Sequence, residues 1–416
     1  PAALRLCREL GLEDRLLGTN DARRKVYVLD RGRLRSLPDG VMLIVPTRFT
    51  PFALSPLISV PGKVRMGMDL FIPPRREDSD ESLADFIRRR LGQEALDKIA
   101  EPLMAGIHVA DPERLSLQAT FPRFIQLEQK YGSLIKGMLA QKARRAAGNR
   151  NGAGSDKLSL FMTLRGGLRE LVRALVARLE GDLLLGTGVA ELARDQDGYQ
   201  LRLADGRSLV ADAVILATPS FAAADLVSPL HPELAARLRA IRYVSTATIS
   251  LGFQRVEFEH PLNGFGFVVS ARDKSKLMAC TWTSTKFDAR APGEHVLLRA
   301  FVGGPRNEGL VDLPDEELLD LVRGELREVM GVAARPVLTR IYRWPGGNPQ
   351  YDVGHLERVD QLEAMAADLP GLHLTGSAYR GVGLPDCIQQ GQTTAEAVLA
   401  TIAEDETVSQ PVEAPS

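Results

Sequence analysis

The sequence predicts a mixed α/β (α+β) fold made of more than one structural unit. Strand patterns and helix patterns alternate along the whole chain, and no internal repeat is visible. The 416 residues are 44% hydrophobic, which is enough for a large core. Helical patterns dominate from about residue 51 to 141 and short β runs dominate residues 243–305, so we expect a helical part and a sheet-rich part.

The first third of the chain combines helical patterns with one hairpin. Residues 2–17 form an amphipathic helical pattern with a break at Gly11. Residues 25–38, KVYVLDRGRLRSLP, alternate around a central turn and predict a hairpin. Residues 80–107, DESLADFIRRRLGQEALDKIAEPLMAGI, have acids in the first turn and apolar residues at helical spacing. Residues 142–157 are rich in Gly, Asn and Arg and predict a solvated surface loop.

The remainder of the chain alternates strands with helices. Residues 158–179, LSLFMTLRGGLRELVRALVARL, predict a strand, a Gly–Gly turn and a helix. We expect further strands in LLLGTGVAEL, GYQLRLADGRSLVA and ADAVILATP, within residues 183–219. A helix at about 314–330 precedes a strand in RPVLTRIYRW, residues 335–344. The last residues, 404–416, predict a disordered tail.

Composition excludes several classes of protein. The formal net charge of −1 gives no reason to expect a nucleic-acid partner. Three widely separated cysteines, Cys7, Cys280 and Cys387, indicate a reducing compartment and neither a disulfide framework nor a zinc site. No apolar run approaches the roughly 18 residues of a membrane span, and no signal peptide is visible. The sequence starts at Pro1 inside a helical pattern, so we expect further residues upstream.

One segment near the C-terminus carries the pattern of a ligand site. In GLHLTGSAYRGVGLPDCIQQG, residues 371–391, a short apolar strand leads through a glycine-bearing loop into a helix whose first turn holds Pro385. A helix N-terminus offers unpaired N–H groups and partial positive charge. Gly381 and Gly383 allow a flat or anionic group to approach the backbone. A tight turn that contacts no ligand explains this segment alone equally well.

Further motifs accompany this segment over nearly the whole chain. Residues 183–219 form a meander that ends in an apolar strand and the tripeptide ATP. The other motifs are LGLEDRLL, RLGQEALDKIAEPLMAGIHVADPERLSLQATFPRF, LRGGLRELVRAL, YRWPGGNPQYDVGHLERV and GSAYRGVGLPDCIQQGQTTA. On these residues the sequence resembles the flavin amine oxidase superfamily and, within it, the oxygen-dependent porphyrinogen oxidases of haem synthesis. The meander alone would indicate only a flavoprotein.

The resemblance implies a domain organisation. A Rossmann-like FAD-binding domain would comprise residues 1–20, 158–240 and 346–403. A β-sheet substrate-binding domain would comprise residues 21–50 and 241–345, and a helical subdomain residues 51–157, with the tail over 404–416.

The sequence departs from this family at one motif. The family begins with a strand, a G-x-G-x-x-G turn and a helix that hold the FAD pyrophosphate. That spacing is absent, because Gly186/Gly188, Gly264/Gly266 and Gly381/Gly383 each lack the third glycine. Either the sequence is a fragment that lacks the first βαβ unit, or the chain has lost this cradle. The retained flavin-facing motifs favour the fragment.

The resemblance also implies roles for individual residues. FAD would contact Val189, Trp344, Ser377, Val382, Gly383 and Leu384. A core position is the favoured alternative for Val189, and a packing role explains Trp344 equally well. Phe265, Val268 and Phe301 would flank the flat porphyrinogen ring, although ordinary sheet core explains each of them equally well.

The implied reaction transfers hydride from a meso carbon of the porphyrinogen to the flavin, which O2 reoxidises with release of H2O2. Three such cycles aromatise the ring. The cofactor carries the chemistry, so we name no catalytic side chain, and no H-E-x-x-H, G-x-S-x-G or P-loop motif is present.

Two porphyrinogens fit the resemblance. Met42 stands where eukaryotic relatives carry a propionate-binding arginine, which favours the bacterial branch and coproporphyrinogen III over protoporphyrinogen IX. Arg48 and Lys63 are candidates for propionate contacts, with surface solvation as the favoured alternative. Residues 41–72 are apolar with few charges and line either the substrate entrance or a membrane face.

We expect a cytoplasmic enzyme with a porphyrinogen and O2 as its small-molecule partners; peripheral membrane contact and oligomeric state stay open. One alternative is an amine oxidase or desaturase, although GSAYRG offers only Tyr379 where amine oxidases present an aromatic pair. Another is a porphyrin-binding chain without a cofactor, which the missing glycine motif would explain.

Overall fold

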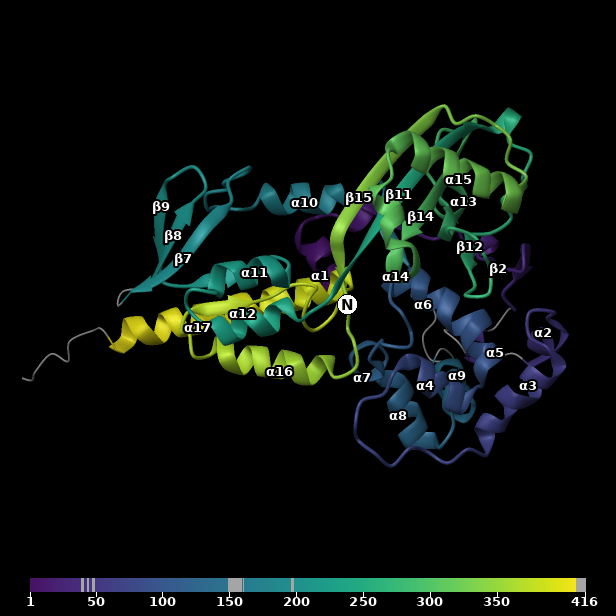
Figure 1. The fold of residues 1–416 in the computed structure, drawn as a ribbon, viewed down its shortest axis with the longest axis horizontal. Coiled ribbons are helices and arrows are strands. Elements are labelled where there is room, and N and C mark those ends of the chain that lie inside the picture. The colour runs from purple at the N-terminus through teal and green to yellow at the C-terminus, as the bar shows by residue number, and fades with distance from the viewer. Residues whose placement is uncertain are drawn as a thin grey trace, which may run out of the picture. The chain divides into compact units, whose positions relative to one another are not determined.

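The computed structural model describes residues 1–38, 41–42, 45–46, 49–148, 159, 161–195 and 198–408 (Figure 1). Contacts divide the chain into two compact units. Unit 1 comprises Pro1–Asp14, Leu168–Arg242 and Pro349–Ser416, and unit 2 comprises Arg15–Gly167 and Tyr243–Asn348. Each unit is therefore built from separate stretches of the sequence.

Unit 1 combines two small sheets with six helices among its described residues. Its strands are β7 (Val189–Asp195), β8 (Gly198–Leu203), β9 (Ser208–Ala211), β10 (Val214–Leu216) and β16 (Leu372–Leu374). Its helices are α1 (Ala2–Glu9), α10 (Arg169–Val176), α11 (Ser220–Val227), α12 (Pro232–Arg239), α16 (His355–Ala366) and α17 (Leu384–Val408). Strands β7, β8 and β9 form an antiparallel meander, whereas β10 and β16 pair in parallel.

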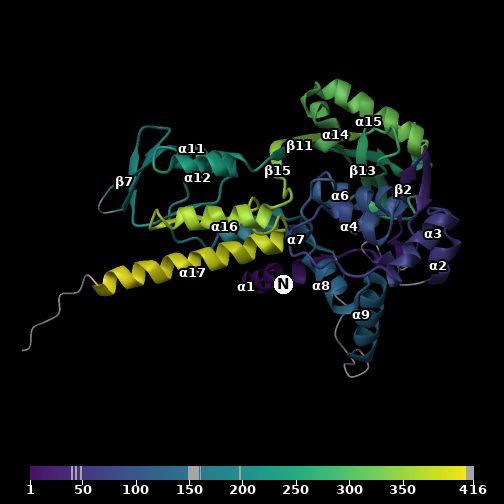
Figure 2. The same ribbon diagram turned by 60° about the horizontal axis from the view of Figure 1, so that its bottom comes forward.

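The meander is attached to the rest of unit 1 through a buried tyrosine. The Tyr199 hydroxyl of β8 donates to the carbonyl oxygens of Leu369 and Pro370, at 3.1 and 2.9 Å, directly before β16. This contact fixes the start of β16, and β16 leads into the glycine-bearing loop and α17. Helix α17 is labelled in Figure 2.

Unit 2 is built on a seven-stranded sheet in the order β15-β11-β14-β13-β12-β2-β3. These strands are β15 (Leu338–Pro349), β11 (Tyr243–Gln254), β14 (His295–Gly303), β13 (Leu277–Trp282), β12 (Gly266–Val269), β2 (Val26–Asp30) and β3 (Arg33–Ser36). The predicted hairpin is confirmed as β2 and β3. It joins the sheet through a parallel pairing of β2 with β12.

The remaining elements of unit 2 are mostly helices. They are α2 (Phe49–Leu54), α3 (Val60–Gly67), α4 (Leu83–Arg90), α5 (Gln93–Ala95), α6 (Glu101–His108), α7 (Leu117–Thr120), α8 (Pro122–Tyr131), α9 (Leu134–Gly148), α13 (Thr283–Lys286), α14 (Gly304–Asn307) and α15 (Asp315–Met330). Two short pairs of strands complete the unit, β1 (Leu16–Gly18) with β6 (Met162–Leu164) and β4 (Val41–Met42) with β5 (Val45–Pro46). No helix in the described part of the chain is both long and apolar enough to cross a membrane.

The main core of unit 2 lies between the sheet and α15. Along β14, Val296, Leu298, Ala300 and Val302 are buried in this core together with Leu318, Val322 and Leu326 of α15. Because side chains alternate between the two faces of a strand, Phe301 of β14 faces the opposite side of the sheet. The side chains on one face of the sheet therefore stabilise the core with α15. Those on the opposite face, such as Phe301, do not belong to this core.

Four sequence predictions need correction. The helix expected over 2–17 ends at Glu9, because Gly11 has a φ of +71° and residues 16–18 pair as β1. The loop expected over 142–157 begins later, since α9 continues to Gly148. The strand expected in LLLGTGVAEL starts only at Val189, so residues 183–188 do not belong to it. The disordered tail expected over 404–416 begins later, since α17 extends to Val408, and residues 409–416 lie outside the described part of the chain.

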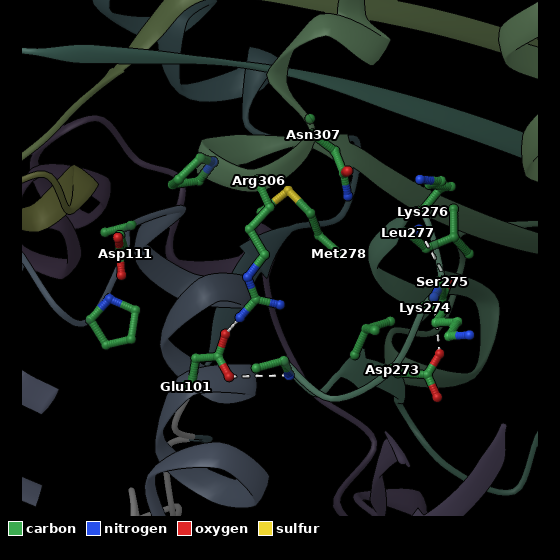
Figure 3. A pocket seen from close by; sticks show the side chains of 16 residues that line it. Glu101, Asp111, Asp273, Lys274, Ser275, Lys276, Leu277, Met278, Arg306 and Asn307 are labelled. Atoms are coloured by element: carbon green, nitrogen blue, oxygen red, sulfur yellow. Dashed lines mark hydrogen bonds and ion pairs between the residues drawn. The ribbon is translucent and has the colours of Figure 1, made fainter. Parts of the chain in front are cut away.

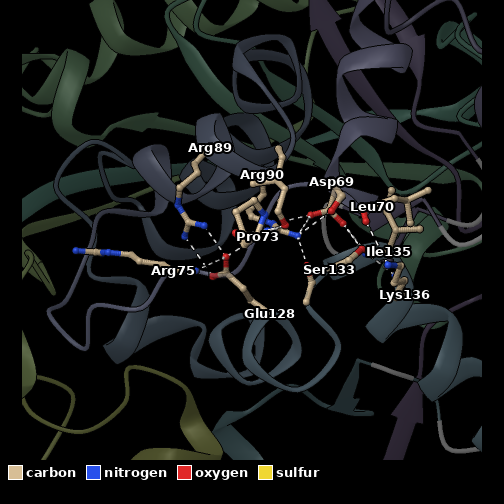
Figure 4. Close-up of polar contacts among 12 residues, drawn as sticks. Asp69, Leu70, Pro73, Arg75, Arg89, Arg90, Glu128, Ser133, Ile135 and Lys136 are labelled. Atoms are coloured by element: carbon tan, nitrogen blue, oxygen red, sulfur yellow. Dashed lines mark hydrogen bonds and ion pairs between the residues drawn. The ribbon is translucent and has the colours of Figure 1, made fainter.

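A buried ionic network holds the helical part of unit 2 together (Figure 4). Arg90 of α4 is completely buried, and its Nε donates to Asp69 Oδ1 at 2.6 Å. Its guanidinium also lies 3.3 Å from Glu128 of α8. Asp69 in turn accepts hydrogen bonds from the Ser133 hydroxyl and the Ile135 amide at the start of α9. Three helices therefore depend on one compensated charge cluster.

We expect Asp69→Ala to lower the free energy of unfolding by about 3–5 kcal/mol, because it leaves the buried Arg90 guanidinium without its main counter-charge. Urea unfolding of the purified protein measures this loss. The matched control is Asp320→Ala on α15, whose exposed carboxylate pairs with Arg323 and for which we expect a loss below about 1 kcal/mol. Equal losses for the two variants would contradict the structural role given to the network.

Candidate functional site

The loop between β16 and α17, residues 375–383, is held in shape by one tyrosine. The Tyr351 hydroxyl donates to the Ser377 carbonyl at 2.9 Å and accepts from the Gly381 amide at 2.8 Å. Its ring stacks on His355 at 3.8 Å, and His355 Nε2 lies 2.7 Å from the Tyr379 carbonyl. Both residues come from the motif YDVGH, to which the sequence reasoning gave no role. They fix the backbone that leads into α17.

The glycines of this loop are required by its own geometry. Gly381 has a φ of +143°, and a Cβ there would lie 2.5 Å from the Cβ of Asp386. A Cβ at Gly383 would lie 2.7 Å from Asp386 Oδ2. Asp386 thus accounts for part of the glycine requirement without any ligand. Its acidic side chain belongs to the first turn of α17, where negative charge is favourable.

The start of α17 is nevertheless open to a ligand. Val382 and Leu384 are 38% and 43% exposed, so protein atoms do not close this position. No acceptor in the described part of the chain takes the N–H groups of Gly383 and Leu384, and Pro385 has no N–H. Two unpaired donors at the positive end of a 25-residue helix fit the negatively polarised pyrimidine edge of a flavin.

The other predicted FAD residues are divided between the units. Ser377 lies in the loop described above, and Val189 is the half-buried first residue of β7 in unit 1. Trp344 lies on β15 in unit 2 and is 54% exposed. The cofactor roles of all three residues remain predictions.

A cavity of about 320 Å³ lies on the face of the unit 2 sheet that is opposite to α15. Phe301 and Trp344 supply its aromatic wall, and Thr248 and Asn348 supply polar groups. The Asn348 amide is fixed by hydrogen bonds to the Val244 carbonyl at 3.0 Å and to Thr246 Oγ1 at 3.1 Å. A mostly apolar cavity with a few fixed polar groups matches the usual site for a small organic ligand.

Hydrogen-bond register explains which predicted substrate residues reach this cavity. Val268, Ala279, Phe301 and Thr248 are direct partners across β12, β13, β14 and β11, so they form one row. Ala279, Phe301 and Thr248 line the cavity, whereas Val268 lies one strand beyond it. Phe265 precedes β12 and lies beneath the Lys286 ammonium instead.

The backbone beside this cavity is strained at Val109. This residue lines the cavity with a φ of +51°, which is unusual for a β-branched side chain. Such strain persists only where the surrounding structure imposes it, and it is frequent at ligand sites. No feature of the sequence around Val109 indicated this conformation.

A second cavity, of about 490 Å³, lies beside the first in unit 2 (Figure 3). The two share Met278, which lies at an irregularity of β13. Arg306 pairs with Glu101, whose second oxygen accepts from the Ala271 amide at 3.1 Å, and burial lowers the pKa of the Arg306 guanidinium. Asp111, Asp273, Lys274 and Lys276 balance the charge of the lining, so the cavity has no marked preference for anions or cations.

Lys63, one candidate for a propionate contact, does not line either of the two cavities described above. Lys63 is half-buried, and its Nζ donates to the Ala53 carbonyl at 2.7 Å. Arg48 lies outside the described residues, and so does the side chain of Met42. Within the described part of the chain no group of acidic, histidine or cysteine side chains forms a metal site.

Comparisons with known proteins agree with this geometry. The model of the family "Flavin containing amine oxidoreductase" matches residues 1–399. A coproporphyrinogen III oxidase of Bacillus subtilis is 39% identical over 96% of this chain and 84% of its own length. A second one, from Propionibacterium freudenreichii, is 38% identical over 96% of this chain and 79% of its own length.

A solved structure extends the comparison to the fold. The crystal structure of a putative protoporphyrinogen oxidase from Exiguobacterium sp. superposes with a TM-score of 0.82 and 33% identity. The superposition covers 95% of this chain and 84% of the chain in that structure. The expected fold, an FAD-binding fold of the flavin amine oxidase type, is thereby confirmed.

We expect Gly381→Ala to lower the free energy of unfolding by about 1–3 kcal/mol, because alanine strains the positive φ and meets Asp386. It should also reduce the flavin content of the purified protein, since the start of α17 is displaced. Urea unfolding and flavin absorbance per mole of protein measure both effects.

The control for this substitution is Gly391→Ala in α17, where a Cβ meets no atom within 4 Å. Removing a glycine from a helix interior should raise stability by about 0.5–1 kcal/mol and leave flavin content unchanged. Normal flavin content in a destabilised Gly381→Ala variant would show that the loop does not position the cofactor.

Proposed function

Because the chain belongs to the family of flavin-containing amine oxidoreductases, we propose that it uses FAD and O2 to oxidise coproporphyrinogen III to coproporphyrin III in haem biosynthesis. The observation that supports a porphyrinogen as the substrate is the similarity to coproporphyrinogen III oxidases over 96% of the chain. The cavity with Phe301 and Trp344 adds physical support, since it presents aromatic faces to a flat apolar ring. Given the tetracarboxylate substrate, we place the reaction in the cytoplasm as part of the same proposal.

Unit 1 carries the residues that fit the flavin. Gly383 and Leu384 offer N–H donors at the positive end of α17, and Val382 and Leu384 add apolar contacts. Tyr351 holds the loop so that these groups are in place before the cofactor binds. When bound, FAD supplies the acceptor for hydride from a meso carbon and the return of electrons to O2 as H2O2.

Unit 2 carries the residues that fit the substrate. Phe301 and Trp344 orient the ring by contact with its faces and exclude water from the reacting carbon. Asn348 is held by two hydrogen bonds, so its side chain keeps a fixed orientation at the cavity wall. Among the described residues that line this cavity none is acidic or basic.

Anaerobic addition of coproporphyrinogen III to the FAD-loaded protein should bleach the blue flavin absorbance, and admission of O2 should restore it with formation of coproporphyrin III. Simple amines should leave the spectrum unchanged. Bleaching by amines alone would assign the chain to amine oxidation instead, and a protein that binds porphyrin but no flavin would support a binding role without catalysis. Faster bleaching by protoporphyrinogen IX would overturn the choice of substrate.

We expect Phe301→Trp to raise the KM for coproporphyrinogen III at least about tenfold, because the larger ring fills a cavity of about 320 Å³. The flavin spectrum should stay unchanged. Steady-state kinetics measure this effect. The control is Tyr342→Trp, which enlarges an exposed ring on β15 that does not line the cavity. An unchanged KM in Phe301→Trp would show that this cavity does not bind the substrate.

A further inference from the structure

Lys286, the last residue of α13, lies among three phenylalanine rings. Its Nζ is 5.2 Å from the ring centre of Phe161, 5.6 Å from that of Phe287 and 5.9 Å from that of Phe265. All three distances are within the range in which a ring face attracts a cation. We call these four residues the lysine cage; all of them belong to unit 2.

The ammonium in this cage has no acidic partner in the described part of the chain. Another half-buried lysine of the same unit, Lys98, pairs with Glu94 at 2.8 Å, whereas Lys286 forms no such pair. Burial lowers the pKa of Lys286, which indicates that its surroundings do not offset the loss of hydration. Ring faces compensate a buried cation only in part, so a carboxylate would stabilise this one further.

The cage is accessible and lies along the strands that form the cavity. Phe161 is 51% exposed, so a ligand can reach the rings from solvent. Helix α13, which ends at Lys286, follows β13 directly, and β13 contributes Ala279 to the cavity wall. The three residue steps from Ala279 to the end of β13 at Trp282 span about 10 Å. Helix α13 adds four further residues up to Lys286, so the tetrapyrrole ring together with a propionate arm, and not the arm alone, would have to cover this span.

We propose that the lysine cage binds one carboxylate arm of the macrocycle, with the ammonium of Lys286 on the carboxylate and the three rings on the methylene groups and the ring edge. This inference rests on the proposed function, because it assumes a macrocyclic polycarboxylate as ligand. Lys286 then discriminates between porphyrinogens by charge, whereas Phe301 and Trp344 contact the apolar ring that all of them share.

The test compares two probes that share one ring: coproporphyrin III, which has four charged carboxylates, and its uncharged tetramethyl ester. Their dissociation constants are measured by porphyrin fluorescence on the full FAD-loaded protein. We expect Lys286→Met to weaken binding of the acid about tenfold, which is about 1.4 kcal/mol, and to leave binding of the ester unchanged. Lys286→Arg, which keeps the charge, should bind the acid within about threefold of the original protein.

The matched control is Lys130→Met, which removes a second lysine that lies over an aromatic ring, 5.8 Å from the centre of Tyr131. It should change binding of neither probe. Equal weakening of acid and ester by Lys286→Met would show that Lys286 only packs, and unchanged binding of the acid would also overturn the proposal. If the original protein binds neither probe, the proposed function itself fails.

Discussion

Hydrogen-bond register across β11, β14, β13 and β12 is the constraint on which unit 2 depends. The register aligns Thr248, Phe301, Ala279 and Val268 in one row and, through the two-residue period of strands, turns their neighbours toward α15. A slip by one residue would exchange the two faces, so the side chains that stabilise the core would enter the cavity. Stability and ligand contact are thus set by the same pairing, and the strained backbone at Val109 is held beside it by the same surroundings.

In unit 1 the main constraint is that backbone N–H donors stay available at the N-terminus of α17. Helices normally satisfy their first N–H groups with a side-chain cap. In α17 the residues before Asp386 are Gly383, Leu384 and Pro385, none of which has a polar side chain, and Tyr351 ties the loop down from outside the helix. Asp386 lies against Gly381 and Gly383. The glycines are therefore explained both by the contact with Asp386 and by a ligand. The loop needs glycine in order to close, and the closed loop leaves the N–H groups of Gly383 and Leu384 unpaired.

Local patterns predicted the hairpin β2–β3, the helix α15 and the strand β16 well, because alternation, turn residues and helical spacing act within a few residues. The family came from motif resemblance and is confirmed. Pairings between distant segments left no local trace: residues 16–18 continue a helical pattern but pair with 162–164. Trp344 and Phe301 were predicted for different ligands, and only tertiary structure brings them to one cavity. The lysine cage likewise joins Phe161 to residues more than 100 positions away, beyond the reach of any sequence window.

The discontinuous composition of the units has a consequence for how the chain is made. All stretches of unit 2 have been synthesised by residue 348, whereas unit 1 needs the stretch from Pro349 onward. Its first helix, α1, packs against its last, α17, and Arg5 bonds to Gln389 across the two at 3.0 Å. During translation α1 therefore lacks the helix it packs against until the stretch from Pro349 onward has been made.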